Sequence, residues 1–207
     1  MFCHQCGVEA QGAYCSHCGA KLITTAQGHE PLPQDWANEV RYDVLLRRPE
    51  VRDLIARHAS QSQKRMSADD FLELCDKAFI PLAGVSLAKI GAIVQPIYAA
   101  LGIKTGKTRK ELFSKPVGKV LVAAISSLAR HGQPLNKVEQ GQDGCLLKAG
   151  IPSDMWSFAG DFLITVERRE QGPSVEAVTV IKGQLYDWGK SKRILTELFN
   201  DIRDLPV

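Results

Sequence analysis

The spacing of apolar residues changes along this chain and divides it into two differently built regions. From residue 35 to about residue 131, apolar residues recur at intervals of three and four, the period of an amphipathic helix. From residue 135 to about residue 182 they form short runs bounded by turn residues, as β-strands do. A last helical segment follows. We therefore expect an α+β fold in which helices cover one face of an antiparallel sheet.

Three helices are expected between residues 35 and 79. The first begins at Asp35 as its cap, the second at Pro49 and the third at Ser67, where Asp70 completes a capping box. We interpret His58, on the apolar stripe of the second helix, as a half-buried residue. The other stripe residues are Trp36, Val40 and Val44 in the first helix, Val51, Leu54 and Ile55 in the second, and Phe71, Leu74, Cys75, Ala78 and Phe79 in the third.

The most apolar part of the chain, residues 78–103, does not have the length of a membrane span. Lys89 lies near its centre, and Pro81 and Pro96 interrupt it. The longest uncharged run, residues 90–103, is shorter than the roughly 18 residues that a span needs. We expect a buried helical hairpin here and a cytoplasmic protein.

The region from residue 117 is expected to form a helix, four strands and a final helix. The first helix covers residues 117–131 and is closed by Gly132. The strands cover residues 135–138, 145–149, 161–169 and 175–182, with Phe162, Ile164 and Val166 pointing inward. Turns at 142–144 and 171–173 join them in hairpins. The final helix begins at about Asp187 and carries Trp188, Leu195, Leu198 and Ile202 on one side.

Four cysteines near the start of the chain stand as two Cys-x-x-Cys pairs, Cys3 with Cys6 and Cys15 with Cys18. Two intervening residues let both sulfurs of a pair turn toward one point, so two pairs supply four corners of a tetrahedron around Zn²⁺. A glycine follows each pair, where positive φ would let backbone N–H groups turn toward the sulfurs. We expect one structural zinc ion, because four thiolate ligands leave no open position for catalysis.

This stretch resembles the short zinc ribbon at the N-terminus of many otherwise unrelated bacterial proteins. The shared pattern is an aromatic residue followed by Cys-x-x-Cys-Gly, and it occurs at residues 2–7 and 14–19. The resemblance covers residues 1–22. It implies a zinc-stabilised fold but no activity, because the family includes adaptors and nucleic-acid binders alike. His4 and His17 lie inside the pairs, and we interpret them as exposed residues rather than ligands.

Three other uses of paired cysteines compete with zinc. Disulfides are disfavoured because no signal peptide precedes the cysteines, and a redox pair is disfavoured because no βαβ pattern surrounds it. Iron–sulfur ligation stays open, since spacing does not exclude it. The two remaining cysteines, Cys75 and Cys145, lie in apolar runs and are expected to be buried hydrophobic residues.

The patterns together suggest four regions: a zinc ribbon (1–22), a linker (23–34), a helical region (35–116) and an α+β domain (117–207). The linker contains Gly28, Pro31 and Pro33 and lacks periodicity, so we expect the ribbon to be tethered rather than built into the core. Residues 183–193 are similar to a segment of small α/β domains in uncharacterised bacterial proteins. That similarity implies no activity.

The most basic stretch lies between residues 104 and 119, where Glu111 is the one acidic residue. Its cations are candidates for holding phosphate groups of nucleic acid, lipid or nucleotide, and a solvated face is the alternative. The segment 102–108 does not match a phosphate loop, because three rather than four residues separate its glycines. We expect a helix to start at the capping box beginning with Thr108. The cations are Lys104, Lys107, Arg109, Lys110, Lys115 and Lys119.

Composition and motifs favour a binding protein over an enzyme. The net charge of +3 is too mild to indicate a nucleic-acid binder by itself. No paired-carboxylate or glycine–nucleophile motif is present, and His131 is explained by its place at a helix end. We expect an adaptor or regulator that binds another macromolecule, most simply a protein. Three alternatives stay open. One is a small-ligand or lipid-binding domain with a pocket between the strands and the last helix, and another is weak, sequence-independent nucleic-acid binding by the basic stretch. The third is an enzyme whose site the sequence motifs do not reveal.

Overall fold

The structure, a computed structural model, describes residues 6, 8, 14, 16–19, 35–62, 66–81, 107–154, 158–181 and 189–207. Contacts between Cα atoms divide the chain into two compact units, Met1–Gln34 and Asp35–Val207. The boundary expected at residue 116 falls inside the second unit. The expected linker, most of the expected helical hairpin and Trp188 lie outside the described residues.

A short 3-10 helix and three α-helices open the second unit. Two of them begin as expected: α2 has Pro49 in its first turn, and α3 has the capping box of Ser67 and Asp70. The Ser67 hydroxyl accepts a hydrogen bond from the Asp70 N–H at 3.1 Å, and the Asp70 carboxylate accepts one from the Ser67 N–H at 3.3 Å. The bounds are η1 (Trp36–Asn38), α1 (Tyr42–Leu46), α2 (Pro49–Ser60) and α3 (Ala68–Ala78).

The prediction of one helix from Asp35 through Val44 is wrong, because the chain breaks between η1 and α1. Asp35 is a cap, accepting a hydrogen bond from the Ala37 N–H at 2.8 Å, but it caps only η1. The Glu39 carboxylate then accepts hydrogen bonds from the N–H groups that follow it, at Val40 and Arg41, both at 2.9 Å. Side-chain acceptors of this kind compete with helical hydrogen bonds, so the helix stops and restarts.

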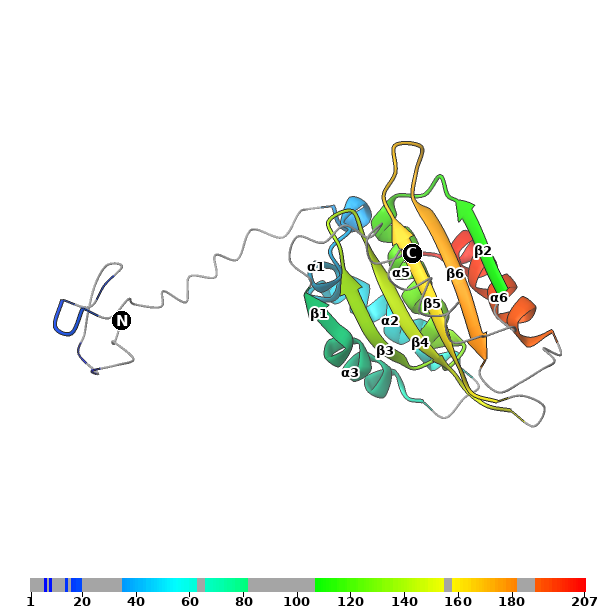
Figure 1. Cartoon of the computed structure of the whole chain (residues 1–207), viewed down its shortest axis with the longest axis horizontal. Coiled ribbons are helices and arrows are strands. Elements are labelled where there is room, and N and C mark those ends of the chain that lie inside the picture. Colours follow the sequence, from blue (N-terminus) through cyan, green and yellow to red (C-terminus); the bar gives the residue numbers. More distant parts are fainter. Residues whose placement is uncertain are drawn as a thin grey trace, which may run out of the picture. The chain divides into compact units, whose positions relative to one another are not determined.

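Six strands form one sheet in the order β1-β3-β4-β5-β6-β2 (Figure 1). The five strands from β3 to β2 are antiparallel to their neighbours, and β1 pairs parallel to β3 at the edge. This confirms an α+β fold with an antiparallel sheet. The bounds are β1 (Phe79–Pro81), β2 (Lys107–Leu112), β3 (Leu135–Gln140), β4 (Gly144–Ile151), β5 (Gly160–Glu167) and β6 (Ser174–Ile181).

The two edge strands differ from what the sequence predicts. The stripe of α3 was expected to include Phe79, but the helix ends at Ala78 and Phe79 begins β1. The helix expected to start at Thr108 is wrong, because residues 107–112 are β2 and pair with β6. Side chains in a strand alternate between the two faces of a sheet, so the basic residues of β2 are divided between both faces.

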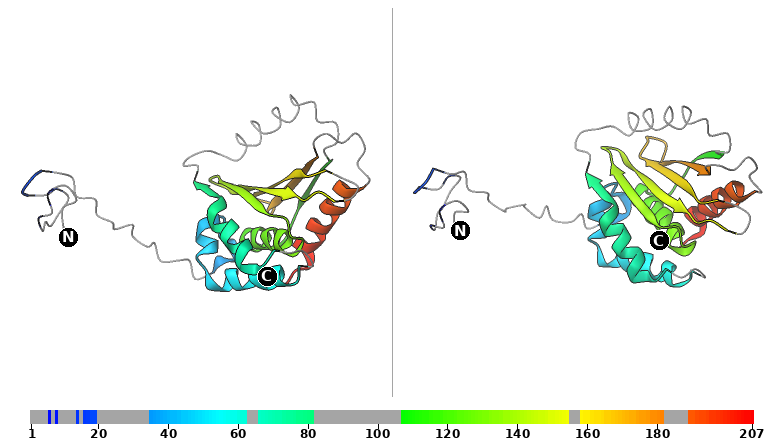
Figure 2. Two further views of the ribbon diagram at one scale, coloured as in Figure 1. Left: turned by 90° about the horizontal axis from the view of Figure 1, so that it is seen from below. Right: turned by 60° about the horizontal axis from the view of Figure 1, so that its bottom comes forward.

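The helices α2, α3, α5 (Val117–Arg130) and α6 (Lys190–Asp204) lie on one face of the sheet (Figure 2). Helix α5 ends as predicted, with His131 as its C-cap and Gly132 in a left-handed conformation at φ 57°. None of the helices in the described part of the chain is both long and apolar enough to cross a membrane.

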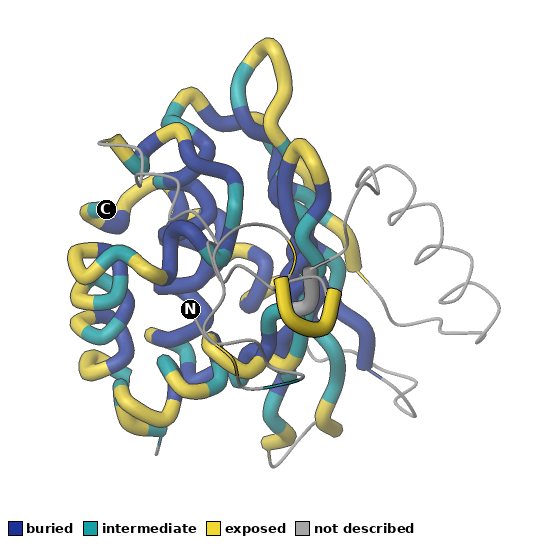
Figure 3. Tube along the Cα trace, turned by 90° about the vertical axis from the view of Figure 1, so that its left-hand side faces the viewer, coloured by how far each residue is buried: buried dark blue, intermediate teal, exposed yellow. Residues whose placement is uncertain are grey.

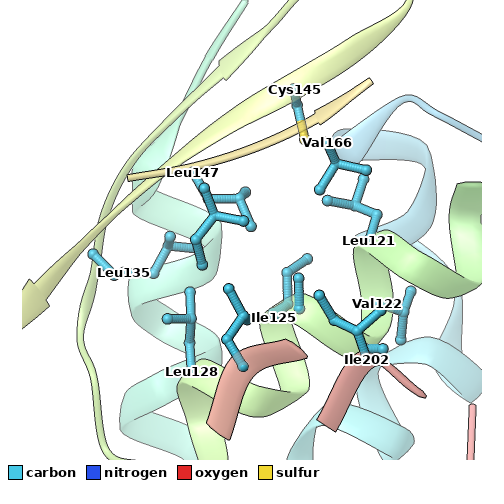
Figure 4. Packing of buried hydrophobic residues seen from close by; sticks show 14 of the residues in the cluster. Leu121, Val122, Ile125, Leu128, Leu135, Cys145, Leu147, Val166 and Ile202 are labelled. Atoms are coloured by element: carbon cyan, nitrogen blue, oxygen red, sulfur yellow. The ribbon is translucent and has the colours of Figure 1, made fainter. Parts of the chain in front are cut away.

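The core fills the space between these helices and the sheet. Leu121 and Ile125 of α5 point toward Leu147 and Val166 of the strands, and all four side chains are fully buried (Figure 4). The buried stretches of the chain gather along the facing sides of helices and strands, and exposed residues concentrate at turns and outer helix faces (Figure 3). On β5 the residues expected to point inward, Phe162, Ile164 and Val166, are buried, which confirms that prediction.

The segment that leads into α1 is fixed to this core at two points. At Gly118 in α5, an added Cβ would lie 2.2 Å from the Trp36 carbonyl oxygen, so only glycine permits this approach. At the end of β3, Gln140 accepts a hydrogen bond from the Tyr42 N–H at 2.8 Å and donates one to the Val40 carbonyl at 3.3 Å. These contacts hold the start of the second unit against both α5 and the sheet.

Candidate functional site

The first unit contains the four expected metal ligands, and the structure describes two of them, Cys6 and Cys18. Cys3 and Cys15 lie outside the described residues. Residues 16–18 form a turn, and Gly19 follows at φ 71° with no atom near the position of a Cβ. This is the positive φ that the sequence analysis expected after the second pair. His17 is exposed, which confirms the expected exposure of that residue; His4 is outside the described residues.

A turn at residues 16–18 followed by a left-handed glycine is a backbone conformation in which N–H groups can turn toward cysteine sulfurs and stabilise bound thiolates. Cysteine thiolates select soft or borderline metals such as zinc, or iron–sulfur clusters. Among the described residues no group of three or more His, Cys, Asp or Glu side chains converges as a metal site.

The basic residues of β2 form contacts within the protein. Arg109 lies over the ring of Phe199 in α6, with 4.7 Å from the guanidinium carbon to the ring centroid, and its Nε donates to the Glu111 carboxylate at 2.6 Å. Lys110 lies on the other face of the sheet and donates to Glu176 of β6 at 2.9 Å. These two cations are therefore partly neutralised and do not share one surface.

Lys115 and Lys119 contact the C-terminal end of α6 instead. The Nζ of Lys115 donates to the Ile202 carbonyl at 3.0 Å and also to the carbonyl of Arg203. The Nζ of Lys119 donates to the Val207 carbonyl oxygen at 3.0 Å. Cations favour the negative end of a helix dipole, so these lysines stabilise the packing of α6. Lys107 begins β2, and Lys104 lies outside the described residues.

A polar cluster joins the C-terminal half of α5 to α6. The Asp201 carboxylate accepts hydrogen bonds from the Ser127 hydroxyl at 2.7 Å, from His131 Nε2 at 2.9 Å and from Arg130 Nη1 at 3.1 Å. Burial alone would raise the pKa of Asp201. The hydrogen bonds from His131 and Ser127, together with the charge of Arg130, outweigh burial and lower that pKa.

The order of groups in this cluster does not suit nucleophilic catalysis. A hydroxyl nucleophile needs a base to take its proton, with a third group orienting the base. Here the carboxylate lies between the hydroxyl and the imidazole, and Ser127 is only 2% exposed. His131 stands out in the sequence at a helix end, but Asp201 lies 70 residues later and no local pattern links it to His131. The cluster holds α5 and α6 together.

His58 of α2 is more buried than the sequence predicts. It is 3% exposed, so the expectation of a half-buried residue is wrong. Within the part of the chain that the structure describes, neither ring nitrogen has a hydrogen-bond partner. Burial lowers the pKa of His58, and the nearby charge of Arg130 lowers it further. The ring is therefore held in its neutral form inside the helix layer.

A hollow of about 420 Å³ lies among α1, α2 and α3. Its charged residues are already paired: Arg52 donates to both carboxylate oxygens of Asp76, at 2.8 and 3.1 Å, and Arg47 donates to Asp43 at 3.0 Å. Buried side chains of α6 pack toward the sheet in the region where a pocket was expected. The hollow is lined by Tyr42, Asp43, Leu46, Arg47, Arg52, Cys75, Asp76 and Phe79.

The cysteine beside this hollow is not a reactive thiol. Cys75 is fully buried, and burial raises the pKa of its thiol to about 12, so it stays protonated. Cys145 is also fully buried, and burial raises its pKa as well. Both cysteines are buried hydrophobic residues, as the sequence analysis predicted.

Comparisons with protein-family models, with curated proteins and with solved structures find no match to this chain.

Proposed function

We propose that this protein is a cytoplasmic adaptor or regulator whose N-terminal zinc ribbon binds another macromolecule by protein contacts. In this proposal Cys3, Cys6, Cys15 and Cys18 hold one structural Zn²⁺. The observation that carries it is the division of the chain into two compact units, the first of which contains both Cys-x-x-Cys pairs. A ribbon that forms a unit of its own is suited to bind a partner while the second unit stays folded.

The charge of the ribbon supports a protein partner over nucleic acid. Four thiolates around one Zn²⁺ carry a net negative charge, and within residues 1–22 Lys21 is offset by Glu9. Such a surface does not attract phosphates. A reducing compartment is part of the same proposal, because thiolates rather than disulfides must be available to the metal.

The second unit supports a binding role because its described polar groups serve packing. Asp201 is occupied by three donors from α5, and Arg109 is held between Glu111 and Phe199. The charged groups at the hollow beside α2 are paired with one another. In the cluster of Ser127, Asp201 and His131 the hydroxyl is buried, so the proposal assigns this cluster no reaction.

Affinity capture with a matched pair of variants tests the proposal. Cys15→Ser removes a metal ligand, whereas Ser16→Ala alters the next residue without removing one. The tagged full-length chain and Ser16→Ala should retain the same protein partner after nuclease treatment, and Cys15→Ser should lose it. An unchanged partner with Cys15→Ser, or capture that disappears with nuclease, would contradict a protein-binding ribbon.

A further inference from the structure

The two edges of the sheet differ in their ability to accept another strand. At one edge β1 has three residues and ends at Pro81, which has no N–H to donate. At the other edge β2 has six residues and, among the described strands, pairs with β6 alone (Figure 1). Short strands and prolines block edge pairing. The edge that can accept an added strand is therefore β2.

The hydrogen-bond pattern shows which groups of β2 point outward. Phe113, just after β2, donates its N–H to the Pro173 carbonyl at 2.9 Å, so these residues form a hydrogen-bonded pair. In an antiparallel pair of strands such pairs alternate with pairs whose N–H and C=O groups point away from the partner. The register continues this alternation back from Phe113. The backbone N–H and C=O groups therefore point away from β6 at Thr108, Lys110 and Leu112.

The side chains of these residues define the chemistry of the edge. Thr108, Lys110 and Leu112 are exposed, and Leu112 is 55% exposed. β2 as a whole carries Lys107, Arg109 and Lys110 against Glu111. Lysine on an edge strand opposes pairing with a second copy of the same strand, because like charges then face each other. An acidic strand with apolar residues between its acids complements this edge in charge and in apolar contact.

We propose that β2 accepts an extended acidic segment of a partner protein as a seventh strand of the sheet. The outward N–H and C=O groups of Thr108, Lys110 and Leu112 supply the main-chain hydrogen bonds, which give affinity in strand addition. Lys107 and Lys110 are exposed on this strand, and their positive charge favours acidic segments over basic ones. This surface belongs to the second unit, so it is an interface in addition to the ribbon and does not depend on zinc.

Amide hydrogen exchange, followed by NMR on the full-length chain, tests the edge directly. The probe is a blocked peptide of alternating glutamate and valine, with a peptide of alternating lysine and valine as its control. In the free chain the amides of Thr108, Lys110 and Leu112 should exchange faster than those of Arg109 and Glu111, which face β6. The acidic peptide at about 1 mM should slow the three outward amides at least about tenfold, and the basic peptide should not.

A pair of variants at Thr108 separates edge pairing from general charge attraction. Thr108→Pro removes one outward N–H and leaves the ladder to β6 intact, whereas Thr108→Val keeps the N–H. The proline variant should weaken binding of the acidic peptide severalfold, and the valine variant should bind normally.

Outward amides already protected in the free chain would mean that this chain or a second copy occupies the edge, and the proposal would fail. Equal protection by both peptides would also overturn it, as would unchanged binding by Thr108→Pro. Cys15→Ser should leave peptide binding unchanged, which keeps this test separate from the ribbon.

Discussion

Asp201 of α6 contacts His131, the C-cap residue of α5, with 2.9 Å between the carboxylate Oδ2 and the ring Nε2. The same carboxylate oxygen accepts a hydrogen bond from the buried Ser127 hydroxyl. One acidic side chain thus satisfies donors over the last turn of α5 and fixes how α6 packs on it. These polar contacts stabilise the packing of α6 on α5.

Replacing the carboxylate should therefore destabilise the second unit. Asp201→Ala leaves the Ser127 hydroxyl without its partner in a buried site, and the free energy of unfolding should fall by about 2 kcal/mol. Chemical denaturation of the full-length chain measures this. The control is Glu197→Ala, whose carboxylate lies 3.8 Å from His131 at the surface and should cost less than about 1 kcal/mol. Equal losses in the free energy of unfolding for the two variants would contradict the conclusion that Asp201 holds α5 and α6 together.

The buried ring of His58 predicts that stability falls in mild acid. Because the folded-state pKa is lowered, the unfolded chain binds the proton more readily. The contribution of neutral His58 to the free energy of unfolding is therefore complete above the unfolded pKa of about 6.5. It is lost as pH falls through the folded pKa. Denaturation at pH values from 7.5 to about 5 should show this decline, and His58→Leu should flatten it. The exposed residue His17 offers a control, since His17→Leu should leave the slope unchanged.

Gly118 predicts a steric requirement at the point where η1 lies on α5. A Cβ at this position would lie 2.2 Å from the Trp36 carbonyl and 2.8 Å from the Ala37 carbonyl, and backbone atoms cannot move aside cheaply. Gly118→Ala should lower the free energy of unfolding by about 1–3 kcal/mol, although alanine favours helices. At Gly150 the nearest atom would be a Pro134 side-chain carbon at 3.1 Å, so Gly150→Ala should cost less. Thermal unfolding of both variants measures which substitution destabilises the protein more.

The internal contacts of the basic residues limit any binding of nucleic acid. Arg109 is held by Glu111 and Phe199, so retention of DNA or RNA by the chain should be weak and should fall steeply with salt. Neutralising Lys107 and Lys110 to Gln should reduce the slope of log affinity against log salt by about 2. Gel shifts at several salt concentrations measure it, with Lys77→Gln on α3 as the control. Salt-resistant binding that disappears with Cys15→Ser would assign recognition to the ribbon instead.

The sequence predicts the elements whose signals are local. Strands β3 to β6 follow one another along the chain as short apolar runs bounded by turn residues, so nearby residues suffice to place them. Helix α3 begins with a capping box, and α5 has apolar residues on nearly every side. These features depend on contacts within a few residues.

The missed features depend on distant partners. Thr108 to Glu111 reads as a capping box, but the same residues pair with β6, which lies some 70 positions later in the chain. Pairing with a sheet overrides a weak local preference for helix. Asp201 could not be linked to His131 for the same reason, since nothing in the spacing of either helix indicates which faces meet. The burial of His58 likewise depends on how the helices pack together.

Metal analysis of the purified full-length chain tests the central claim most directly. Prepared under reducing conditions, the protein should contain one Zn²⁺ per chain, and Cys15→Ser should lose it while Ser16→Ala retains it. Iron in place of zinc, or no metal in the reduced protein, would contradict a zinc ribbon held by Cys3, Cys6, Cys15 and Cys18.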